Sequence, residues 1–278
     1  MGDNGGSSSV RSHRLGFSSL SSGEPREISA YDSAGMKIDV TITACLRPEI
    51  LETTLRSFFD GMFRAHECRL IINVDPVGLD VPQKSVVDVC RSYSPVVVSR
   101  TPSEPSFPVA FKWVWMQVEA PYVFHLEDDW ELLSPVSLSK MVELMESEPD
   151  LAVLRLPRWR TETLTSKNWG HFYPWNGRFF ECPEGRKAEL GFCGHPSLIR
   201  GDFVKKTTPY LDEGKNPEKQ FHYNYKIVEV VKKYRYGVYA TQNSPPIIRE
   251  IGEQWKIANG WIKQGNRAHF VKWTRSQS

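Results

Sequence analysis

The sequence predicts an α/β fold in which a mostly parallel central sheet is flanked by helices within a single domain. Short runs of β-branched and apolar residues alternate along the chain with longer segments whose apolar residues recur at helical spacing. This alternation is typical of parallel sheets covered on both faces by helices. The length of 278 residues, with 40% hydrophobic and 24% charged residues, suits one such domain with a substantial core.

The first half of the chain carries the more regular pattern. Pro48 favours a first helical turn, and Leu51, Leu55 and Phe58 then share one apolar stripe. Ser134-Pro135 is expected to cap a later helix. Strands are predicted at Ile38–Ala44, Leu70–Val74, Val96–Ser99, Tyr122–Leu126 and Leu151–Leu156, with helices from Pro48 and over Val86–Tyr93 and Val109–Val118.

The remaining segments are less regular. Residues 1–35 are rich in Gly and Ser, so we expect a disordered tail, with order beginning at Met36. Residues 158–187 hold many aromatic side chains but little periodicity, which predicts a long irregular loop. Order is expected to return at Gly191–Arg200, followed by a helix from Pro217 to about Lys233 and a strand at Val238–Thr241.

Composition says more about the cellular compartment of the protein than about its function. The formal net charge of +2 is too small to indicate a nucleic-acid or membrane partner by itself. The five cysteines are scattered and odd in number, which favours a reducing compartment over a disulfide framework. No apolar segment has the length of a signal-peptide core or a membrane span. We therefore expect a cytoplasmic protein with no membrane partner.

Acidic residues follow two of the predicted strands. Glu127-Asp128-Asp129 comes directly after Tyr122–Leu126, and Asp75 comes after Leu70–Val74. Ligands of α/β sheets bind beyond the carboxyl ends of the strands, so these acids are predicted to share one site. Adjacent carboxylates are costly unless a cation neutralises them, and their oxygen atoms suit Mg²⁺ or Mn²⁺. The alternative is a solvated loop whose acids favour a helix N-terminus.

These features resemble the GT-A glycosyltransferases, especially their family 2-like group, over about residues 38–200. The similarity lies in the acid triplet that ends a central strand, in the position of Asp75, and in the opening segment Thr41–Pro48 with the helix after it. Residues 247–255 are similar to small bacteriophage enzymes of this kind.

The resemblance implies a fold and an activity. It implies one GT-A-like domain at residues 36–278, with a nucleotide-sugar half at 36–135 and an irregular acceptor half at 136–278. The implied reaction moves a sugar from a nucleotide-diphosphate-sugar, with a UDP-sugar as first candidate, to an acceptor hydroxyl. The implied cofactor is Mn²⁺ or Mg²⁺, which would stabilise the leaving diphosphate.

Residue roles follow from the resemblance together with the chemistry. Asp129 and Asp128 are the expected metal ligands, with Asp128 and Glu127 also placed to contact metal-bound water or the donor ribose. Asp75 is expected to hold the nucleotide base or ribose. An inverting transfer needs a carboxylate base, which similar enzymes place at the start of an acceptor-half helix. The candidate base is Glu218, with Asp212 and Glu213 as substitutes, and the candidate diphosphate partners are Arg47, Lys112 and Arg249.

Three positions depart from the family pattern. Family 2 enzymes usually have Asp-Asp-Gly-Ser after the second strand, where this chain has Asp75-Pro76-Val77-Gly78. Family 2 enzymes usually have an Asn after the first strand, where this chain has Leu46-Arg47. Many relatives supply a late His to the metal, where this chain reads Arg249-Glu250. The third metal ligand is therefore not identified, and His269 is a remote substitute.

The acceptor and two other functions stay open. Arg158 and Lys167 lie among the aromatic residues of segment 159–180, which suits an anionic acceptor such as DNA with a hydroxymethylated base. A packed lid would have a similar composition, and a protein or glycan acceptor is equally open. The chain could also be a nucleotide-binding module with a degenerate site, or a metal-dependent nucleotidyltransferase. Nucleotidyltransferases generally carry a Gly-rich basic loop after the first strand, and this chain lacks one.

Overall fold

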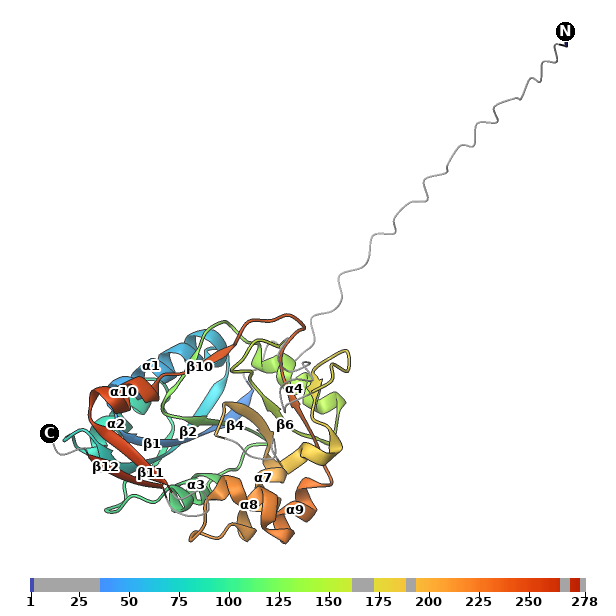
Figure 1. The fold of residues 1–278 in the computed structure, drawn as a ribbon. Coiled ribbons are helices and arrows are strands. Elements are labelled where there is room, and N and C mark those ends of the chain that lie inside the picture. The colour runs from blue at the N-terminus through green and yellow to red at the C-terminus, as the bar shows by residue number, and fades with distance from the viewer. Residues whose placement is uncertain (3–35, 162–172, 189–193, 266–270, 276–278) are drawn as a thin grey trace.

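An eight-stranded sheet with the strand order β3-β2-β1-β4-β8-β6-β9-β7 forms the centre of the molecule (Figure 1). The computed structural model describes residues 1–2, 36–161, 173–188, 194–265 and 271–275, so the predicted tail lies almost wholly outside the described residues. None of the helices in these ranges is long and apolar enough to cross a membrane.

Most strands of the sheet run in one direction, which confirms the predicted architecture. The first four strands are mutually parallel, β8 is antiparallel to both of its neighbours, β9 is parallel to β6, and β7 reverses again at the edge. The strands are β1 (Lys37–Leu46), β2 (Glu67–Gly78), β3 (Val97–Arg100), β4 (Tyr122–Glu127), β6 (Leu151–Arg155), β7 (Phe180–Glu181), β8 (Ser197–Arg200) and β9 (Arg235–Val238).

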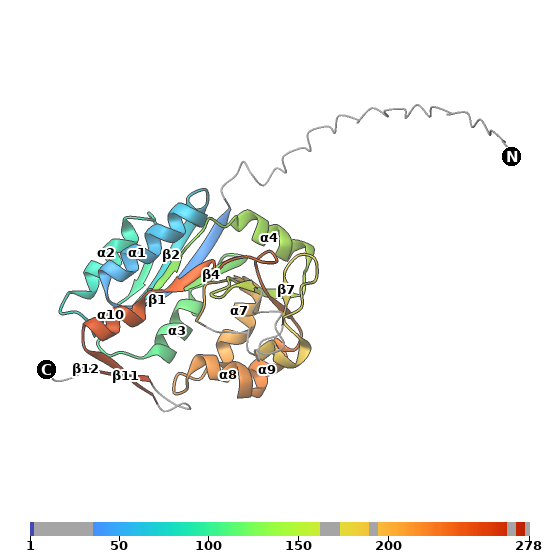
Figure 2. The same ribbon diagram turned by 45° about the horizontal axis from the view of Figure 1, so that its top comes forward.

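Helices cover both faces of the sheet and create two apolar cores (Figure 2). Successive strand residues point to opposite faces, so Leu70 and Ile72 belong to one core while Ile71 belongs to the other. This is why Leu70–Ile72 is an unbroken apolar run, while in β1 the polar residues Asp39, Thr41 and Thr43 are buried as well. The first core is closed by α1 (Pro48–Phe58), α2 (Gln83–Arg91) and α4 (Leu138–Ser147), and the second by α3 (Phe107–Met116), α7 (Gly201–Thr207), α8 (Pro217–Tyr223) and α9 (Tyr225–Val231).

Several predicted boundaries were wrong, each for a local reason. The cap of α4 is Ser137, whose hydroxyl accepts from the Lys140 amide at 3.3 Å, and not Ser134. The helix predicted from Pro217 to Lys233 is two helices, because Asn224 is extended and its side chain caps α9 by accepting from the Lys226 amide. The last predicted strand of the sheet begins and ends earlier, at Arg235–Val238.

A small second sheet and a C-terminal hairpin were not predicted. Strand β5 (Trp130–Leu132) follows the acid triplet directly and pairs antiparallel with β10 (Ile248–Glu250). The helix α10 (Gly252–Ala258) follows β10, and the hairpin of β11 (Trp261–Gly265) and β12 (Val271–Arg275) follows that helix. These elements return the end of the chain to the carboxyl edge of β1 and β4.

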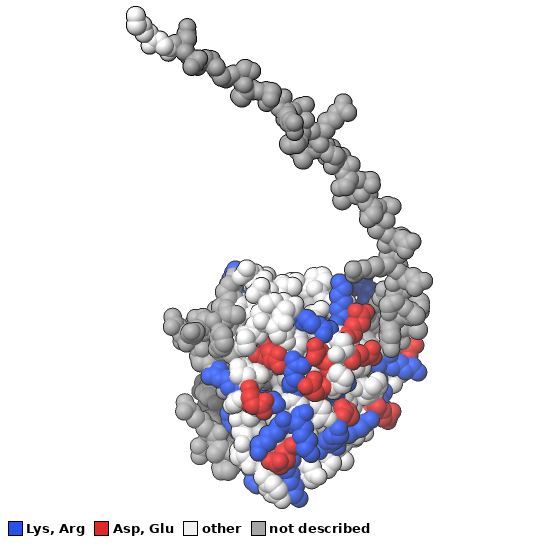
Figure 3. Space-filling view, turned by 90° about the vertical axis from the view of Figure 1, so that its right-hand side faces the viewer, with Lys and Arg blue, Asp and Glu red and all other residues white. Residues whose placement is uncertain are grey.

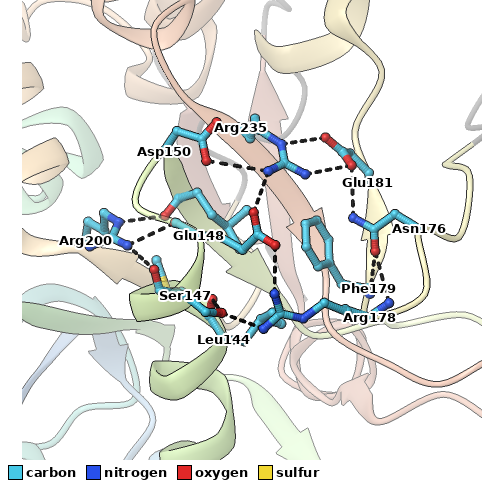
Figure 4. Close-up of polar contacts among 12 residues, drawn as sticks. Leu144, Ser147, Glu148, Asp150, Asn176, Arg178, Phe179, Glu181, Arg200 and Arg235 are labelled. Carbon is cyan, nitrogen blue, oxygen red and sulfur yellow. Dashed lines mark hydrogen bonds and ion pairs between the residues drawn. The ribbon is translucent and has the colours of Figure 1, made fainter.

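Ion pairs join β9, β7 and the loop before β6 at the side of the sheet away from β3. Arg235, at the start of β9, binds Glu181 of β7 at 2.6 Å and Glu148 after α4 at 2.7 Å (Figure 4). The Arg200 guanidinium donates to the Glu148 carbonyl at 3.1 Å in the same region. The face of the molecule turned to the viewer in Figure 3 interleaves acidic and basic side chains. The described residues of this face thus form no single-sign patch of the kind that an anionic polymer requires.

The central aromatic packing of the first core gives a test of the fold. Phe124 of β4 is fully buried, and its ring lies 5.7 Å from that of Phe58 and 5.2 Å from that of Phe63. We expect Phe124→Ala to lower the free energy of unfolding by about 3–5 kcal/mol, because it leaves a cavity. The exposed Met116→Ala should change it by less than about 0.5 kcal/mol. Urea denaturation of both variants checks this, and equal stabilities would contradict the packing.

Candidate functional site

The carboxyl ends of β1, β2 and β4 meet at one edge of the sheet and bring the predicted acids together. Asp75 lies in the last four residues of β2, and Asp128 comes directly after β4. The backbone amide of Cys45, near the end of β1, donates to Asp128 Oδ2 at 3.0 Å. Burial raises the pKa of Asp75, and the negative charge of Asp128 acts in the same direction. Val74 pairs with Ala44 and Glu127 pairs with Thr43, so the two acids lie at the ends of the strands that flank β1.

Arg47 neutralises the acids that follow β4. Its Nε donates to Asp128 Oδ2 at 3.2 Å, its Nη2 donates to Asp128 Oδ1, and the same Nη2 lies 3.2 Å from Asp129 Oδ2. Only 5% of Arg47 and 2% of Asp128 are exposed. The carboxylates raise the pKa of the Arg47 guanidinium, against the effect of its burial. Burial raises the pKa of Asp128, which Arg47 and the Cys45 amide oppose.

The helix α10 covers this ion-pair cluster of Arg47, Asp128 and Asp129. Its first residue, Gly252, packs so closely on Asp129 that a Cβ atom there would overlap the carboxylate. One turn later, the Trp255 ring lies 5.4 Å from the Arg47 guanidinium carbon. The Trp255 indole donates to Glu49 Oε1 at 2.6 Å, which ties α10 to the first turn of α1. The cluster is therefore enclosed by elements from both ends of the described chain.

Asp75 is held by residues outside the ion-pair cluster. Asn73 donates to its Oδ1 at 2.8 Å, and the Ser106 amide, at the N-cap of α3, donates to its Oδ2 at 3.1 Å. Each carboxylate oxygen can accept two hydrogen bonds, so Asp75 retains acceptor capacity for a ligand. Arg100, at the end of β3, contributes a positive charge that lowers the pKa of Asp75. Sequence reasoning missed Arg100, because a single arginine after a short strand gives no signal.

Two further acids from distant parts of the chain flank Gly194. The Gly194 amide donates to Glu218 Oε1 at 3.2 Å, in the first turn of α8. A Cβ at position 194 would lie 2.5 Å from Oε1 of Glu127, so the glycine lets the two segments approach. The structure therefore places the predicted base Glu218 on the same side as the acid triplet.

The other predicted residues lie in exposed ion pairs. Lys112 on α3 binds Glu213 at 3.2 Å, and Asp212 binds Lys215 at 2.8 Å. Arg249 on β10 donates through its Nε to Glu131 of β5 at 3.1 Å. Three of the predicted cations, Arg47, Lys112 and Arg249, thus already have carboxylate partners. The substitute ligand His269 lies outside the described residues.

The donor atoms at the cluster do not fit a divalent metal while Arg47 stays in place. Both oxygens of Asp128 already accept N–H groups, and Asp129 Oδ2 faces Arg47. Within the described ranges, no group of three or more His, Cys, Asp or Glu side chains could hold a metal ion. A divalent ion on the free oxygen of Asp129 would lie roughly 5 Å from the guanidinium, where the two charges repel by about 7 kcal/mol at an effective dielectric constant of 20.

Aromatic side chains pack around Gly194 and His195. The Trp130 indole donates to the Gly194 carbonyl at 3.0 Å, and the His195 ring lies 5.0 Å from that of Trp130. The Arg158 guanidinium lies 4.9 Å from the ring of Trp159, which is 44% exposed. Of the predicted aromatic segment, residues 162–172 fall outside the described residues.

Two buried histidines near the site give a pH prediction. Burial lowers the pKa of His125 to about 3, and burial together with Arg155 and Arg158 lowers that of His195 to about 3. Both are neutral in the fold but bind protons near pH 6.5 once unfolded, so stability is full above pH 6.5 and falls as the pH drops below it. We expect each histidine to cost about 2 kcal/mol between pH 7 and pH 5.

Denaturation at several pH values checks this linkage. His195→Gln should remove about half of the pH dependence that the pair creates, because one of the two protons is then no longer taken up on unfolding. His222→Gln changes an exposed histidine and should leave the slope as in the wild type. A His195→Gln slope equal to that of the wild type would show that the fold does not lower the pKa of His195.

Comparison with known proteins gives a fold but no close relative. No protein-family model matches the chain, and no curated protein matches it. Among solved structures, S. aureus TarS superposes with a TM-score of 0.51 at 11% identity, over 76% of this chain and 36% of TarS. TarS 1–349 in complex with UDP gives a TM-score of 0.51 at 12% identity, over 76% and 59% of the two chains.

The same fragment in complex with UDP-GlcNAc gives a TM-score of 0.50 at 13% identity, over 76% of this chain and 57% of that one. The chain thus spans less than two thirds of each of these proteins. At such identities the likeness concerns the fold alone. The strand order, the acids at the ends of β2 and β4 and these superpositions together give the chain a GT-A-type fold.

Proposed function

We propose that this chain is a glycosyltransferase that binds a nucleotide-diphosphate-sugar, with a UDP-sugar as first candidate. The observation that carries the proposal is that Asp75 and the acid triplet lie at the carboxyl ends of β2 and β4, the two strands that pair with β1 on either side. This is the edge at which sheets of this type bind their ligands. The superposition on TarS structures that contain UDP and UDP-GlcNAc supports the same donor class.

The nucleoside end of the donor is assigned to Asp75. Its carboxylate is fixed by Asn73 and by the Ser106 amide, so it needs little reorganisation to accept a further hydrogen bond. The N–H of a uracil ring or the hydroxyls of a ribose are suitable donors for it. Arg100 lies beside it as a cation that could contact the donor phosphates.

The transfer step is assigned to Glu218 as general base. It would take the proton of the acceptor hydroxyl while that oxygen forms a bond to the sugar C1 and the bond from C1 to the diphosphate oxygen breaks. The diphosphate leaves with the bonding electron pair. Glu218 accepts from the Gly194 amide, and Glu127 lies against the same glycine, which supports a base close to the end of β4. The divalent metal predicted from the sequence is left out of the proposal, because the donor atoms of the cluster do not fit it.

The acceptor is proposed at a coarser level. Trp159 and Arg158 offer an exposed ring beside a cation, which suits the face of a sugar or of a base. DNA with a hydroxymethylated base, a protein side chain and a glycan are the classes to test. Incubation with labelled donor and each class, followed by measurement of retained label, distinguishes them. Label on none of them, with intact UDP binding, would favour a binding module, and nucleotide joined to the acceptor would indicate a nucleotidyltransferase.

Donor binding gives the first test of this function. We expect Asp75→Asn to weaken UDP binding at least tenfold, or about 1.4 kcal/mol, because the amide replaces an acceptor by a donor. Isothermal titration calorimetry measures the affinity. The exposed Asp80→Asn, five residues further along, is the control and should bind UDP as the wild type does. Equal affinities of the two variants would remove Asp75 from the site.

The base gives the second test. We expect Glu218→Gln to lower kcat by about 10²–10⁴-fold, the range typical of general-base removal, with UDP affinity unchanged. Glu229→Gln alters an exposed glutamate paired with Lys232 and should keep full activity. Transfer rates with the labelled acceptor measure both. If Asp212→Asn or Glu213→Gln loses the activity instead, the base lies in the loop before α8.

A further inference from the structure

We infer that the Arg47 guanidinium takes the place of a divalent cation at the end of β4, so that donor binding by this chain does not require Mn²⁺ or Mg²⁺. The inference rests on the proposed function for its ligand. Its structural basis, the ion-pair cluster, is independent of that ligand.

The guanidinium occupies the position where the two aspartates converge. It contacts both oxygens of Asp128 and one oxygen of Asp129. The Cys45 amide supplies a further donor to Asp128, so this carboxylate has three N–H groups and little remaining capacity for a metal. A planar guanidinium with several donors suits this arrangement better than an ammonium group does.

Arg47 cannot leave the cluster without moving its surroundings. Its carbonyl accepts from the Ile50 and Leu51 amides, both at 3.1 Å, and so fixes its backbone at the start of α1. Its side chain is 6% exposed and lies under the Trp255 ring. Trp255 is in turn held by Glu49. A metal that displaced the guanidinium would have to open α10.

The aspartates are also fixed in the geometry that suits Arg47. The Asp128 carbonyl accepts from the Thr54 hydroxyl at 2.7 Å, and the Asp129 carbonyl accepts from the Ile251 amide at 2.8 Å. With both backbones held and Gly252 packed on the Asp129 carboxylate, the acids are pre-organised around a guanidinium. Arg47 therefore acts as a positioning residue that keeps the β4 end and α10 together.

Titration of the wild-type protein with UDP is the first arm of the test. We expect the same Kd, within twofold, in the presence of EDTA and in the presence of Mn²⁺. A Kd that weakens tenfold or more in EDTA overturns the inference and leaves the proposed function standing. Absence of UDP binding under both conditions contradicts the proposed donor, and the second arm then decides on Arg47 alone.

The second arm measures the melting temperature with and without Mn²⁺. The wild type should show no shift, and a rise on adding Mn²⁺ overturns the inference. Arg47→Met should melt lower and recover several degrees with Mn²⁺, since the unpaired acids are then open to a metal. Arg47→Lys keeps the charge and should remain insensitive to Mn²⁺. The control Arg69→Met breaks the ion pair with Asp39, whose Oδ2 also accepts two backbone amides, and should lose stability without recovery.

If Arg47→Met does not fold in EDTA, its folding yield in Mn²⁺ gives the same readout. Recovery by Mn²⁺ supports the inference. Equal failure under both conditions, together with metal-dependent UDP binding by the wild type, counts against it.

Discussion

The ion pair between Arg47 and the two aspartates after β4 is the interaction on which the functional edge of this molecule depends. Removing two carboxylates and a guanidinium from water is expensive, and their attraction repays that cost only with close geometry and further hydrogen bonds. Both conditions are met, because the Cys45 amide completes the coordination of Asp128 and the backbones of both aspartates are held. Loss of one partner would leave an uncompensated buried charge. It would therefore destabilise both α10 and the end of β4.

The sheet provides the rigid frame around this cluster. Its central strands are packed on both faces, which fixes the positions of the residues at their carboxyl ends. The parallel pairing of β1 with β2 and with β4 thus sets the positions of Asp75 and Asp128 relative to each other. The second half of the chain contributes Gly194 and Glu218 to the site, and these residues contact each other. The strand that it places next to β4 is the antiparallel β8.

The sequence predicted the frame well because burial on both faces leaves a strong pattern. Residues 38–44 and 70–74 read as strands, since most of them are β-branched or apolar, and all of them are buried in the fold. The three-residue strands β5 and β10 were missed because so short a pattern cannot be told from a loop. The break at Asn224 was also missed, because the apolar residues on either side continue the helical spacing across it.

At the site, sequence reasoning found the acids but could not identify their counter-ion. Three adjacent carboxylates require positive charge, and a metal or an arginine meets that requirement with the same composition. Two of the three departures from the family pattern lie near these acids: Arg47 supplies the guanidinium, and Arg249-Glu250 pairs with β5, which follows the acids directly. Arg47 thus binds the two aspartates, and α10, which follows Glu250, packs on Asp129. The positive charge beside the acids is that of residue 47, through a contact between segments about 80 residues apart that only the folded chain reveals.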